Sequence, residues 1–345
     1  MAHYLITGGS GFLGINLVRY LLAKGHQVRS LDLLPFDYPE HELIDHRVGD
    51  VRDSDAMREA AQDIDFIVHC AAALPLCEEQ EIRSTEVEGT ACVLDAAAQC
   101  KVQRTVFISS TAVYGVPDHH PLTEDDPRRG VGPYGESKIE AEKLCEAARD
   151  NGQVVAIIRP KSFIGPERLG IFALLYDFAA DGHHFPVLGN GRQKFQLLDV
   201  EDLCQAIVQC TEVDAALAND TFNVGAADYD CPRNDFQAVL DAAGFGRRIV
   251  SLPRWPAVMA LKVLARLNLS PVYEWVYESA DKESWTSIDK ARQQLGFSPQ
   301  HSNRQALLRN FHWYLAHRDE FSQSSGVTHR VPFRQGMLAL VKKIL

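Results

Sequence analysis

Paired cysteines, long apolar runs and internal repeats are missing from this sequence, and each absence excludes a class of protein. None of the eight cysteines forms a C-x-x-C pair, so we expect no zinc site and no disulfide framework, but thiols that stay reduced in the cytoplasm. No apolar run reaches the roughly 18 residues that a membrane-spanning helix needs. No charged leader or apolar stretch precedes the first β-rich run, so no export signal is expected.

Positive charge is also scarce. The 35 Lys and Arg residues are outnumbered by 46 Asp and Glu residues, which gives a formal net charge of −11. Such a chain is not expected to bind nucleic acid, because it would repel the phosphates. The histidine pairs are adjacent rather than at helical spacing, so no metal site is expected. With 345 residues, 46% of them hydrophobic, the chain can form two domains or one large α/β unit.

Short β-rich runs alternate with helix-length segments as far as Pro160. Apolar strands separated by helices predict a parallel sheet covered on both faces, that is, a Rossmann-type doubly wound α/β fold. The expected strands are Tyr4–Thr7, Gln27–Asp32, His46–Asp50, Phe66–Cys70, Thr105–Ser109 and Val154–Arg159, and the expected helices are Phe12–Lys24, Ser54–Ala61, Glu86–Cys100 and Tyr134–Asp150.

The alternation becomes less regular after Pro160. We expect an NAD-binding domain over residues 1–165, to which some later segments return, and a smaller mixed α/β substrate domain over residues 166–330. Residues 331–345 form a short basic amphipathic tail. A C-terminal helix docked on the fold is favoured for it, and weak, reversible peripheral contact with the inner membrane surface is the alternative. The later elements expected are helices at Ile171–Asp181, Glu201–Thr211 and Asn234–Ala243, strands at Thr221–Val224 and Arg248–Leu252, and a largely apolar segment at Trp255–Leu269.

A glycine-rich turn joins the first expected strand to the first helix. In the segment TGGSGFLG, Gly8 permits the tight turn, Gly11 lets the backbone approach a pyrophosphate, and Gly14 lets helix and strand pack closely. Phe12 and Leu13 open the helix, whose N-terminus offers N–H groups and a positive dipole to an anion. This strand–turn–helix pattern predicts a dinucleotide site.

Asp32 stands at the end of the second expected strand. A carboxylate there accepts hydrogen bonds from the hydroxyls of a ribose and repels a 2′-phosphate. We therefore expect the cofactor to be NAD rather than NADP.

Tyr134 and Lys138 lie four residues apart in the segment YGESK, on one face of an expected helix. A tyrosine with a pKa near 10 is too weakly acidic to serve as a base at neutral pH, but a neighbouring ammonium lowers that pKa. Ser110, in the serine-rich end of the fifth expected strand, can donate a hydrogen bond to a substrate oxygen. The three residues predict proton transfer at a secondary alcohol or ketone.

These motifs together resemble the extended short-chain dehydrogenase/reductases, the NAD-dependent epimerase/dehydratase family. The resemblance extends from the first strand to about residue 316 and implies that Ser110, Tyr134 and Lys138 are the catalytic triad, with Lys138 also holding the nicotinamide ribose. It further implies a homodimer formed through the helices Glu86–Cys100 and Tyr134–Asp150. The other cofactor contacts it implies are Asp50 and Val51 beside the adenine, then Ala71, Ala72 and Ala73, and Pro160 and Ser162 of the RPKSFIGP segment.

The chain departs from the family pattern at several positions. The Asp-Glu pair of the sugar dehydratases is replaced by Thr111 and Ala112, which disfavours a dehydratase. Phe195 stands where sugar-nucleotide enzymes usually carry an arginine that grips the diphosphate, and Arg192 and Lys194 are the nearby cations that could take its place. Glu86 replaces the usual asparagine of the "NVxGT" motif. We take Thr111, Arg192 and Phe195 as candidate substrate-binding residues.

The apolar residue at position 195 and the apolar segment Trp255–Leu269 resemble the 3β-hydroxysteroid dehydrogenase branch of the family. The sequence therefore favours an NAD-dependent dehydrogenase that acts on a bulky, lipophilic or steroid-like small molecule. A nucleotide-sugar 4-epimerase with tightly bound NAD is the alternative, and a non-catalytic dinucleotide-binding subunit is a second one. Trp255–Leu269 lines a substrate channel, touches a membrane surface or is a buried helix, and the sequence leaves these open.

Overall fold

The computed structural model describes residues 1–74, 77–266 and 282–321, and its chain divides into two compact units. The first unit consists of Met1–Phe163, Val200–Gly225 and Thr286–Pro299. The second unit consists of the described parts of Ile164–Asp199, Ala226–Trp285 and Gln300–Leu345. The chain thus leaves the first unit after Phe163 and returns to it twice.

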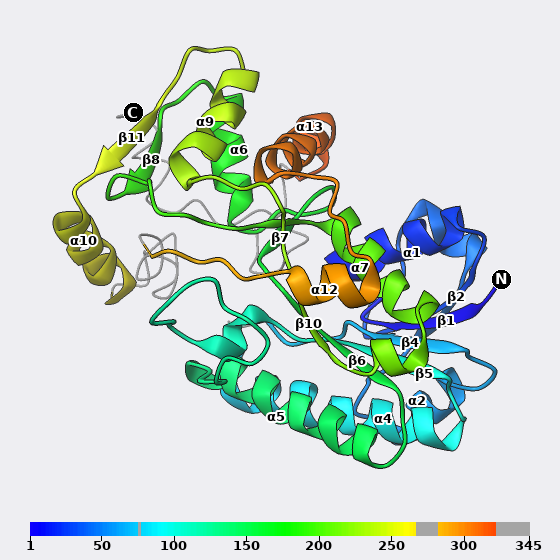
Figure 1. Ribbon diagram of the computed structural model, residues 1–345. Helices are drawn as coiled ribbons and strands as arrows, with labels where there is room; N and C mark the ends of the chain where they lie inside the picture. The colour runs from blue at the N-terminus through cyan, green and yellow to red at the C-terminus, as the bar shows by residue number, and fades with distance from the viewer. Residues whose placement is uncertain (75–76, 267–281, 322–345) are drawn as a thin grey trace. The chain divides into compact units, whose positions relative to one another are not determined.

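A parallel sheet of seven strands forms the centre of the first unit (Figure 1). Its strand order is β10-β6-β5-β4-β1-β2-β3, and every neighbouring pair is parallel. The predicted doubly wound fold is confirmed. The strands are β1 (His3–Thr7), β2 (Gln27–Asp32), β3 (Asp45–Val48), β4 (Phe66–His69), β5 (Arg104–Ile108), β6 (Val155–Pro160) and β10 (Thr221–Val224).

The order of the strands reverses between β1 and β4, which are neighbours with Thr7 opposite His69. From β1 the chain builds outward to β2 and β3, and from β4 it builds in the other direction. In open parallel sheets, ligands bind at the carboxyl ends of the strands beside such a reversal. The fold therefore points to the ends of β1 and β4 as the site.

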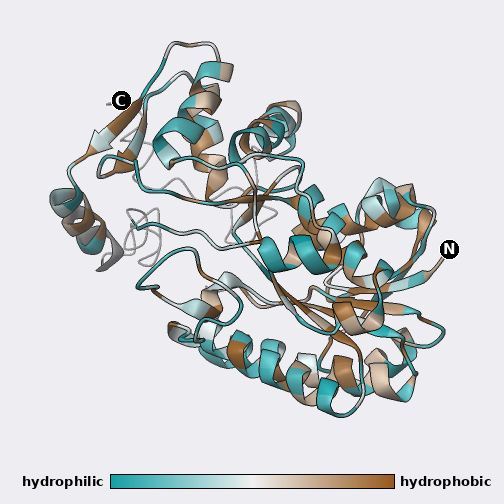
Figure 2. Cartoon of the chain, in the orientation of Figure 1, coloured by the Kyte–Doolittle hydropathy of each residue, from teal (hydrophilic) through white to brown (hydrophobic). Residues whose placement is uncertain are grey.

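Helices cover both faces of this sheet. Figure 1 shows α2, α4 and α5 on one face and α1 and α7 on the other. Figure 2 shows the strands as largely hydrophobic and α5 as mostly hydrophilic along its visible side, which is the pattern expected of a sheet buried on both faces. The helices of the first unit are α1 (Phe12–Ala23), η1 (Pro39–Leu43), α2 (Ser54–Ala60), α3 (Glu79–Arg83), η2 (Ser84–Glu88), α4 (Gly89–Gln99), η3 (Thr111–Tyr114), α5 (Gly132–Asp150), α7 (Val200–Glu212), α8 (Ala215–Ala218) and α12 (Asp289–Leu295).

The second unit packs helices around its own apolar core. Tyr176, Leu240 and Phe311, from three different helices, are buried there together. A short parallel pair, β8 with β11, lies beside them. Its elements are α6 (Phe172–Ala180), β8 (Phe185–Leu188), β9 (Leu198–Asp199), α9 (Pro232–Ala242), β11 (Ile249–Leu252), α10 (Arg254–Arg266) and α13 (Asn303–Phe321), while β7 (Phe163–Ile164) joins the two units along the chain.

Most expected elements agree with the structure to within two residues, and two of the differences have local causes. The helix expected at Glu86–Cys100 is divided, because a π-helical turn, η2, precedes α4. The strand expected at His46–Asp50 ends at Val48, where Asp50 turns to accept hydrogen bonds from the Arg52 side chain.

The apolar segment expected at Trp255–Leu269 is helical as α10 as far as Arg266, and its remaining residues lie outside the described part of the chain. Trp255 is 77% exposed and Met259 is 47% exposed. The expected tail, residues 331–345, also lies outside the described residues. Among the described residues, no helix combines the length and the apolar character needed to cross a membrane.

Candidate active site

The glycine-rich turn after β1 has the geometry that close approach of a phosphate requires. Gly8 has a φ of +73°, and a Cβ there would lie 2.8 Å from the backbone of Ala71. A Cβ at Gly14 would collide with the backbone oxygens of Gly8 and Gly9. Gly11 precedes α1 and supplies no capping side chain, so the first-turn N–H groups, which an α-helix leaves unpaired, suit an anion. The turn fits the pyrophosphate of NAD.

Asp32, at the end of β2, is held against this turn. Its Oδ2 accepts a hydrogen bond of 2.9 Å from the Ser10 N–H, and its Oδ1 accepts one of 2.9 Å from the Leu34 N–H. Arg29, the nearest cation in the strand, points elsewhere, because its guanidinium binds Asp45 at 2.5 Å and the carbonyl oxygens of Ala60 and Gln62. No arginine of β2 therefore offsets the charge of Asp32 towards a 2′-phosphate.

Asp50 and Val51 follow β3 in the loop that leads to α2. Asp50 forms a two-oxygen ion pair with Arg52, and the hydrogen bonds from Arg52 lower the pKa of the Asp50 carboxyl. Val51 is 6% exposed, and a Cβ at Gly89 would lie 2.9 Å from its Cγ2. The two residues sit next to each other, as expected, with Val51 fixed by packing.

Ala71, Ala72 and Ala73 follow β4, beside the reversal point of the sheet. The Ala71 N–H donates to Thr7 Oγ1 at 3.3 Å, and Ala73 is buried. Pro160 ends β6, and Ser162 is exposed just beyond it. These residues all lie at carboxyl ends of strands in the first unit.

A chain of hydrogen bonds ties the ends of β1 and β4 to η2. Thr7 Oγ1 lies 2.7 Å from His69 Nδ1, and His69 Nε2 lies 3.1 Å from Thr90 Oγ1. Thr90 in turn donates to the carbonyl oxygen of Glu86 at 2.5 Å. Burial lowers the pKa of His69 to about 3, so the ring is neutral. Because the Thr90 hydroxyl donates its proton to the Glu86 carbonyl oxygen, it can only accept a hydrogen bond from His69. His69 therefore donates from Nε2 and accepts at Nδ1.

Lys138 is fully enclosed beneath this network. Its Nζ donates to the carbonyl oxygen of Ile108 at 2.8 Å and lies 2.8 Å from Glu86 Oε2. Burial is the largest influence and acts to lower the pKa of Lys138, but the contact with Glu86, together with the nearby Tyr134 and Cys70, outweighs burial and the pKa is raised. Burial raises the pKa of Glu86, opposed by the Lys138 ammonium. The sequence marked Glu86 as a departure, but nothing in it indicated this contact.

Tyr134 lies one turn before Lys138 in α5, and the centre of its ring is 5.9 Å from Nζ. The start of α5 packs against η3, the short helix that follows β5, since a Cβ at Gly135 would lie 3.1 Å from the Ala112 carbonyl oxygen. Ser110 is there, its Oγ accepting from the Ala112 N–H at 3.1 Å, and next to it Thr111 Oγ1 lies 3.4 Å from the Pro160 carbonyl oxygen. The structure thus brings these expected residues to one edge of the sheet.

Arg192 and Phe195, the other candidate substrate residues, belong to the second unit. Arg192 is exposed in the loop after β8. Phe195 packs partly buried against the apolar core of that unit, and its carbonyl oxygen accepts a hydrogen bond of 2.7 Å from the Asn303 amide. The main chain of Phe195 is thus tied to Asn303, and that of Arg192 to Asn190 Oδ1, which accepts a hydrogen bond of 2.9 Å from the Arg192 N–H.

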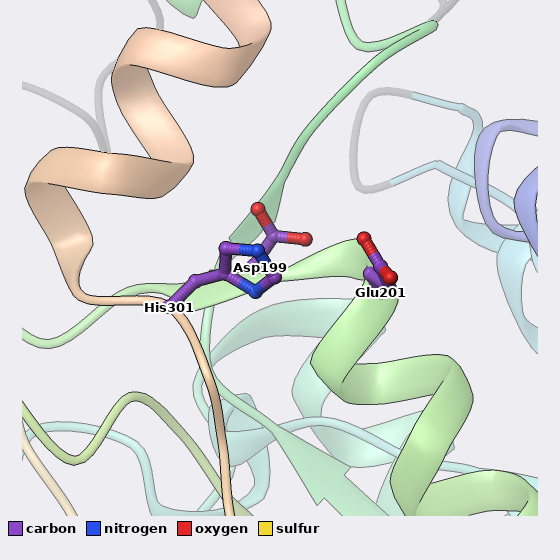
Figure 3. Close-up of side chains that lie close together, drawn as sticks. All are labelled: Asp199, Glu201 and His301. Atoms are coloured by element: carbon purple, nitrogen blue, oxygen red, sulfur yellow. The ribbon is translucent and has the colours of Figure 1, made fainter.

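Asp199 and His301 form a polar cluster in the second unit, shown with Glu201 in Figure 3. Arg309 Nη1 lies 2.7 Å from Asp199 Oδ1 and 3.0 Å from His301 Nε2. A guanidinium already supplies the positive charge next to both side chains. We therefore interpret the cluster as a structural ion pair between Arg309 and Asp199, and we assign no metal to it.

A doubly wound sheet with a glycine-rich turn at its reversal point, and a tyrosine one helical turn before a buried lysine, defines a dinucleotide-dependent oxidoreductase of the extended short-chain type. The chain belongs to the NAD-dependent epimerase/dehydratase family, whose sequence model matches residues 4–225. It is an enzyme of this family and its cofactor is NAD, as predicted.

The chain is similar to proteins of several activities. It is 34% identical over 341 residues to an uncharacterised protein of Sinorhizobium fredii, covering 98% of this chain and 85% of that one. It is 29% identical over 344 residues to the 3β-hydroxysteroid dehydrogenase/Δ5→4-isomerase of Mycobacterium tuberculosis, covering 92% and 91%. The fold matches UDP-glucose 4-epimerase of Thermotoga maritima with a TM-score of 0.76 and 20% identity, covering 91% and 99%.

Proposed function

We propose that Tyr134 is the catalytic acid and base of this enzyme, with Lys138 and Ser110 as its partners. The observation that carries the proposal is the buried Lys138 ammonium, held by the Ile108 carbonyl oxygen with its charge 5.9 Å from the ring centre of Tyr134. A cation fixed in a dry site stabilises a phenolate much more strongly than it would in water.

In the oxidation direction, Tyr134 takes the hydroxyl proton of a secondary alcohol while the substrate carbon loses hydride. Bound NAD supplies the hydride acceptor, and its reduced form supplies the donor in the reverse direction. Ser110 Oγ donates to the substrate oxygen, and Lys138 keeps the phenol of Tyr134 acidic. An ammonium has three N–H groups, so beyond those facing Ile108 and Glu86, Lys138 would have one with which to hold the cofactor ribose.

We propose a bulky, lipophilic alcohol as the substrate. The partly buried apolar side chain of Phe195 supports this, because it has no group that could bind a diphosphate. The similarity to a 3β-hydroxysteroid dehydrogenase over nearly the whole chain supports it too. The exposed cation of Arg192 favours a second candidate, a nucleotide-sugar 4-epimerase.

The cofactor content of the purified protein distinguishes the two candidates. An epimerase returns the hydride to the same substrate and must retain its cofactor throughout. A dehydrogenase releases the cofactor in each cycle. We expect denatured protein to release little NAD or NADH, and we expect NADH to bind reversibly to the native protein. Near-stoichiometric release would instead establish the epimerase.

We also propose that Asp32 selects NAD. Replacing it by alanine removes the acceptor for the ribose hydroxyls and the repulsion of a 2′-phosphate. Asp32→Ala should weaken NAD binding about tenfold or more, while NADP binding stays unchanged or improves. Titration of both cofactors by fluorescence measures this, and equal losses for NAD and NADP would contradict the assignment.

A homodimer formed through α4 and α5 is a further proposal. The two helices lie side by side on one face of the sheet (Figure 1), and the family resemblance pairs these helices between subunits. Light scattering should give a mass of twice 38.4 kDa, and a monomer at micromolar concentration would contradict it.

A further inference from the structure

The buried carboxylate of Glu86 is the feature of the site that the family pattern does not account for. Its side chain is 0% exposed, that of Lys138 is 2% exposed, and Oε2 lies 2.8 Å from Nζ. Burying a carboxylate is costly unless it serves a partner. Glu86 lies in η2, a π-helical turn, and its carbonyl oxygen accepts a hydrogen bond from the Thr90 hydroxyl.

We propose that Glu86 is a positioning residue that fixes the Lys138 ammonium and moderates its influence on the acidity of Tyr134. The inference rests on the proposed function, in which Tyr134 is the base. A lone ammonium would stabilise the phenolate with its full charge. With a carboxylate 2.8 Å from the ammonium, the phenolate instead senses an ion pair, whose net effect is weaker than that of the ammonium alone and falls off faster with distance. The phenol of Tyr134 therefore loses its proton at a higher pH than it would beside a lysine with no carboxylate partner.

The other titratable groups near the Lys138 ammonium are uncharged near pH 7, so the opposing charge comes from Glu86. Burial lowers the pKa of His69 to about 3 and raises that of Cys70 to about 12, so both are neutral near pH 7. Burial also raises the pKa of Cys145 on α5, whose thiol stays protonated. Of the described groups named here, Glu86 is the carboxylate in contact with Lys138, so it supplies the negative charge that opposes the ammonium.

The test is the Glu86→Gln variant, which removes the charge and keeps the shape. Its amide oxygen can still accept from Lys138, so the ammonium keeps a partner. We expect the acidic limb of the kcat/KM profile to move down by about one pH unit. In the cofactor-free protein, the phenolate absorbance should titrate at a lower pH by a similar amount, with the Tyr134→Phe protein subtracted.

Two further variants serve as controls. Glu88→Gln removes the same charge from an exposed position in the same turn, and it should leave both titrations in place. Glu86→Asp keeps the charge and should restore the wild-type limb. If Glu86→Gln does not fold, Glu86→Asn replaces it, and NAD binding reports whether each variant has a native site.

An unmoved or upward-shifted titration in Glu86→Gln, with NAD binding intact, would overturn the inference. So would a shift of equal size in Glu88→Gln, because it would reflect surface charge in general. Failure of the proposed function gives a different result, since Tyr134→Phe would then retain turnover. In that case the phenolate titration of the cofactor-free protein still decides the role of Glu86.

Discussion

Two buried ion pairs, Lys138–Glu86 and Arg159–Glu142, each have one member on α5, and these two members lie one helical turn apart. The pairs differ in the number of hydrogen bonds that their carboxylates accept. Glu142 accepts hydrogen bonds from Ser109, Arg128 and both ends of the Arg159 guanidinium, at 2.6 to 3.0 Å. Burial acts to raise the pKa of Glu142, but Arg159, Ser109 and Arg128 together outweigh burial and the pKa is lowered. At the other pair, burial prevails and the pKa of Glu86 is raised.

The difference separates a structural anchor from a reactive centre. Two donors on each oxygen of Glu142 leave that carboxylate nothing further to bind, and Arg159 joins α5 to β6. Glu86 is held mainly by one ammonium, which the mechanism also requires. We infer that equal burial of a charge says little about function, and that the number of its donors says more.

The largest expected effect is on chemistry at the reactive end. Tyr134→Phe removes one hydroxyl, which turnover needs and the fold does not. We expect turnover to fall about 10³-fold, a size typical for loss of a general acid and base, while the melting temperature and NAD binding stay unchanged. Steady-state rates with any alcohol or ketone that the wild-type enzyme turns over measure the loss of turnover, and a thermal melt of the same sample measures the melting temperature. Undiminished turnover would assign the proton transfer to another group.

The next effect is on stability at the anchor. Glu142→Gln leaves the buried guanidinium of Arg159 without a countercharge, and breaking a buried pair in this way costs about 3 kcal/mol of unfolding free energy. Urea denaturation measures the loss. Glu146→Gln is the matched control, because Glu146 lies one turn further, is 40% exposed and also binds Arg128, so it should cost less than about 1 kcal/mol. Equal costs would remove the distinction between anchor and surface pair.

The pH dependence of stability should have opposite signs at the two carboxylates. Since the pKa of Glu142 is below its usual value of 4.5 when folded, its ionisation stabilises the protein above that pH, and the gain is lost as the pH falls. The raised pKa of Glu86 has the reverse consequence, because its ionisation weakens the fold as the pH rises. Relative to wild type, Glu142→Gln should therefore become less unstable in acid, and Glu86→Gln more unstable. Denaturation at about pH 4 and pH 7 measures both, and parallel trends would contradict the contrast.

The local parts of this comparison could be predicted from the sequence, and the contacts between distant residues could not. The turn around Gly8, Asp32 at the end of β2, and the spacing of Tyr134 and Lys138 are patterns within short segments. The Glu86–Lys138 pair joins residues far apart in the chain. It also depends on a π-helical turn, which has no distinctive sequence pattern, because a helical repeat near 3.6 residues is all that periodicity detects.

The second unit was harder to predict for a related reason. α13 spans 19 residues, Asn303–Phe321, and no helix was expected there. Its apolar residues do not form one clear stripe, since Leu307 and Phe311 are buried while Leu315 is 45% exposed. The place of Phe195 depends on Asn303, which holds its carbonyl oxygen from the start of this helix.

The smallest expected effect tests what holds the reactive turn. The hydrogen bonds at this turn come from uncharged groups, since His69 is neutral and Thr90 links His69 to the Glu86 carbonyl oxygen. The anchor at Glu142 depends on charged groups instead. Thr90→Val keeps the side-chain shape but removes the hydroxyl that His69 Nε2 and the Glu86 carbonyl oxygen share, while His69 Nδ1 keeps its partner Thr7. The loss at buried Nε2 should cost about 1–2 kcal/mol of unfolding free energy.

Thr90→Ser keeps the hydroxyl and should recover most of that loss, so urea denaturation of the two variants isolates the hydrogen bond from the packing. Because His69 carries no charge above about pH 3, the cost of Thr90→Val should be constant from about pH 5 to pH 8. A cost that grew as the pH fell would mean that His69 is protonated in the fold. The reactive turn would then depend on charge, as the anchor does.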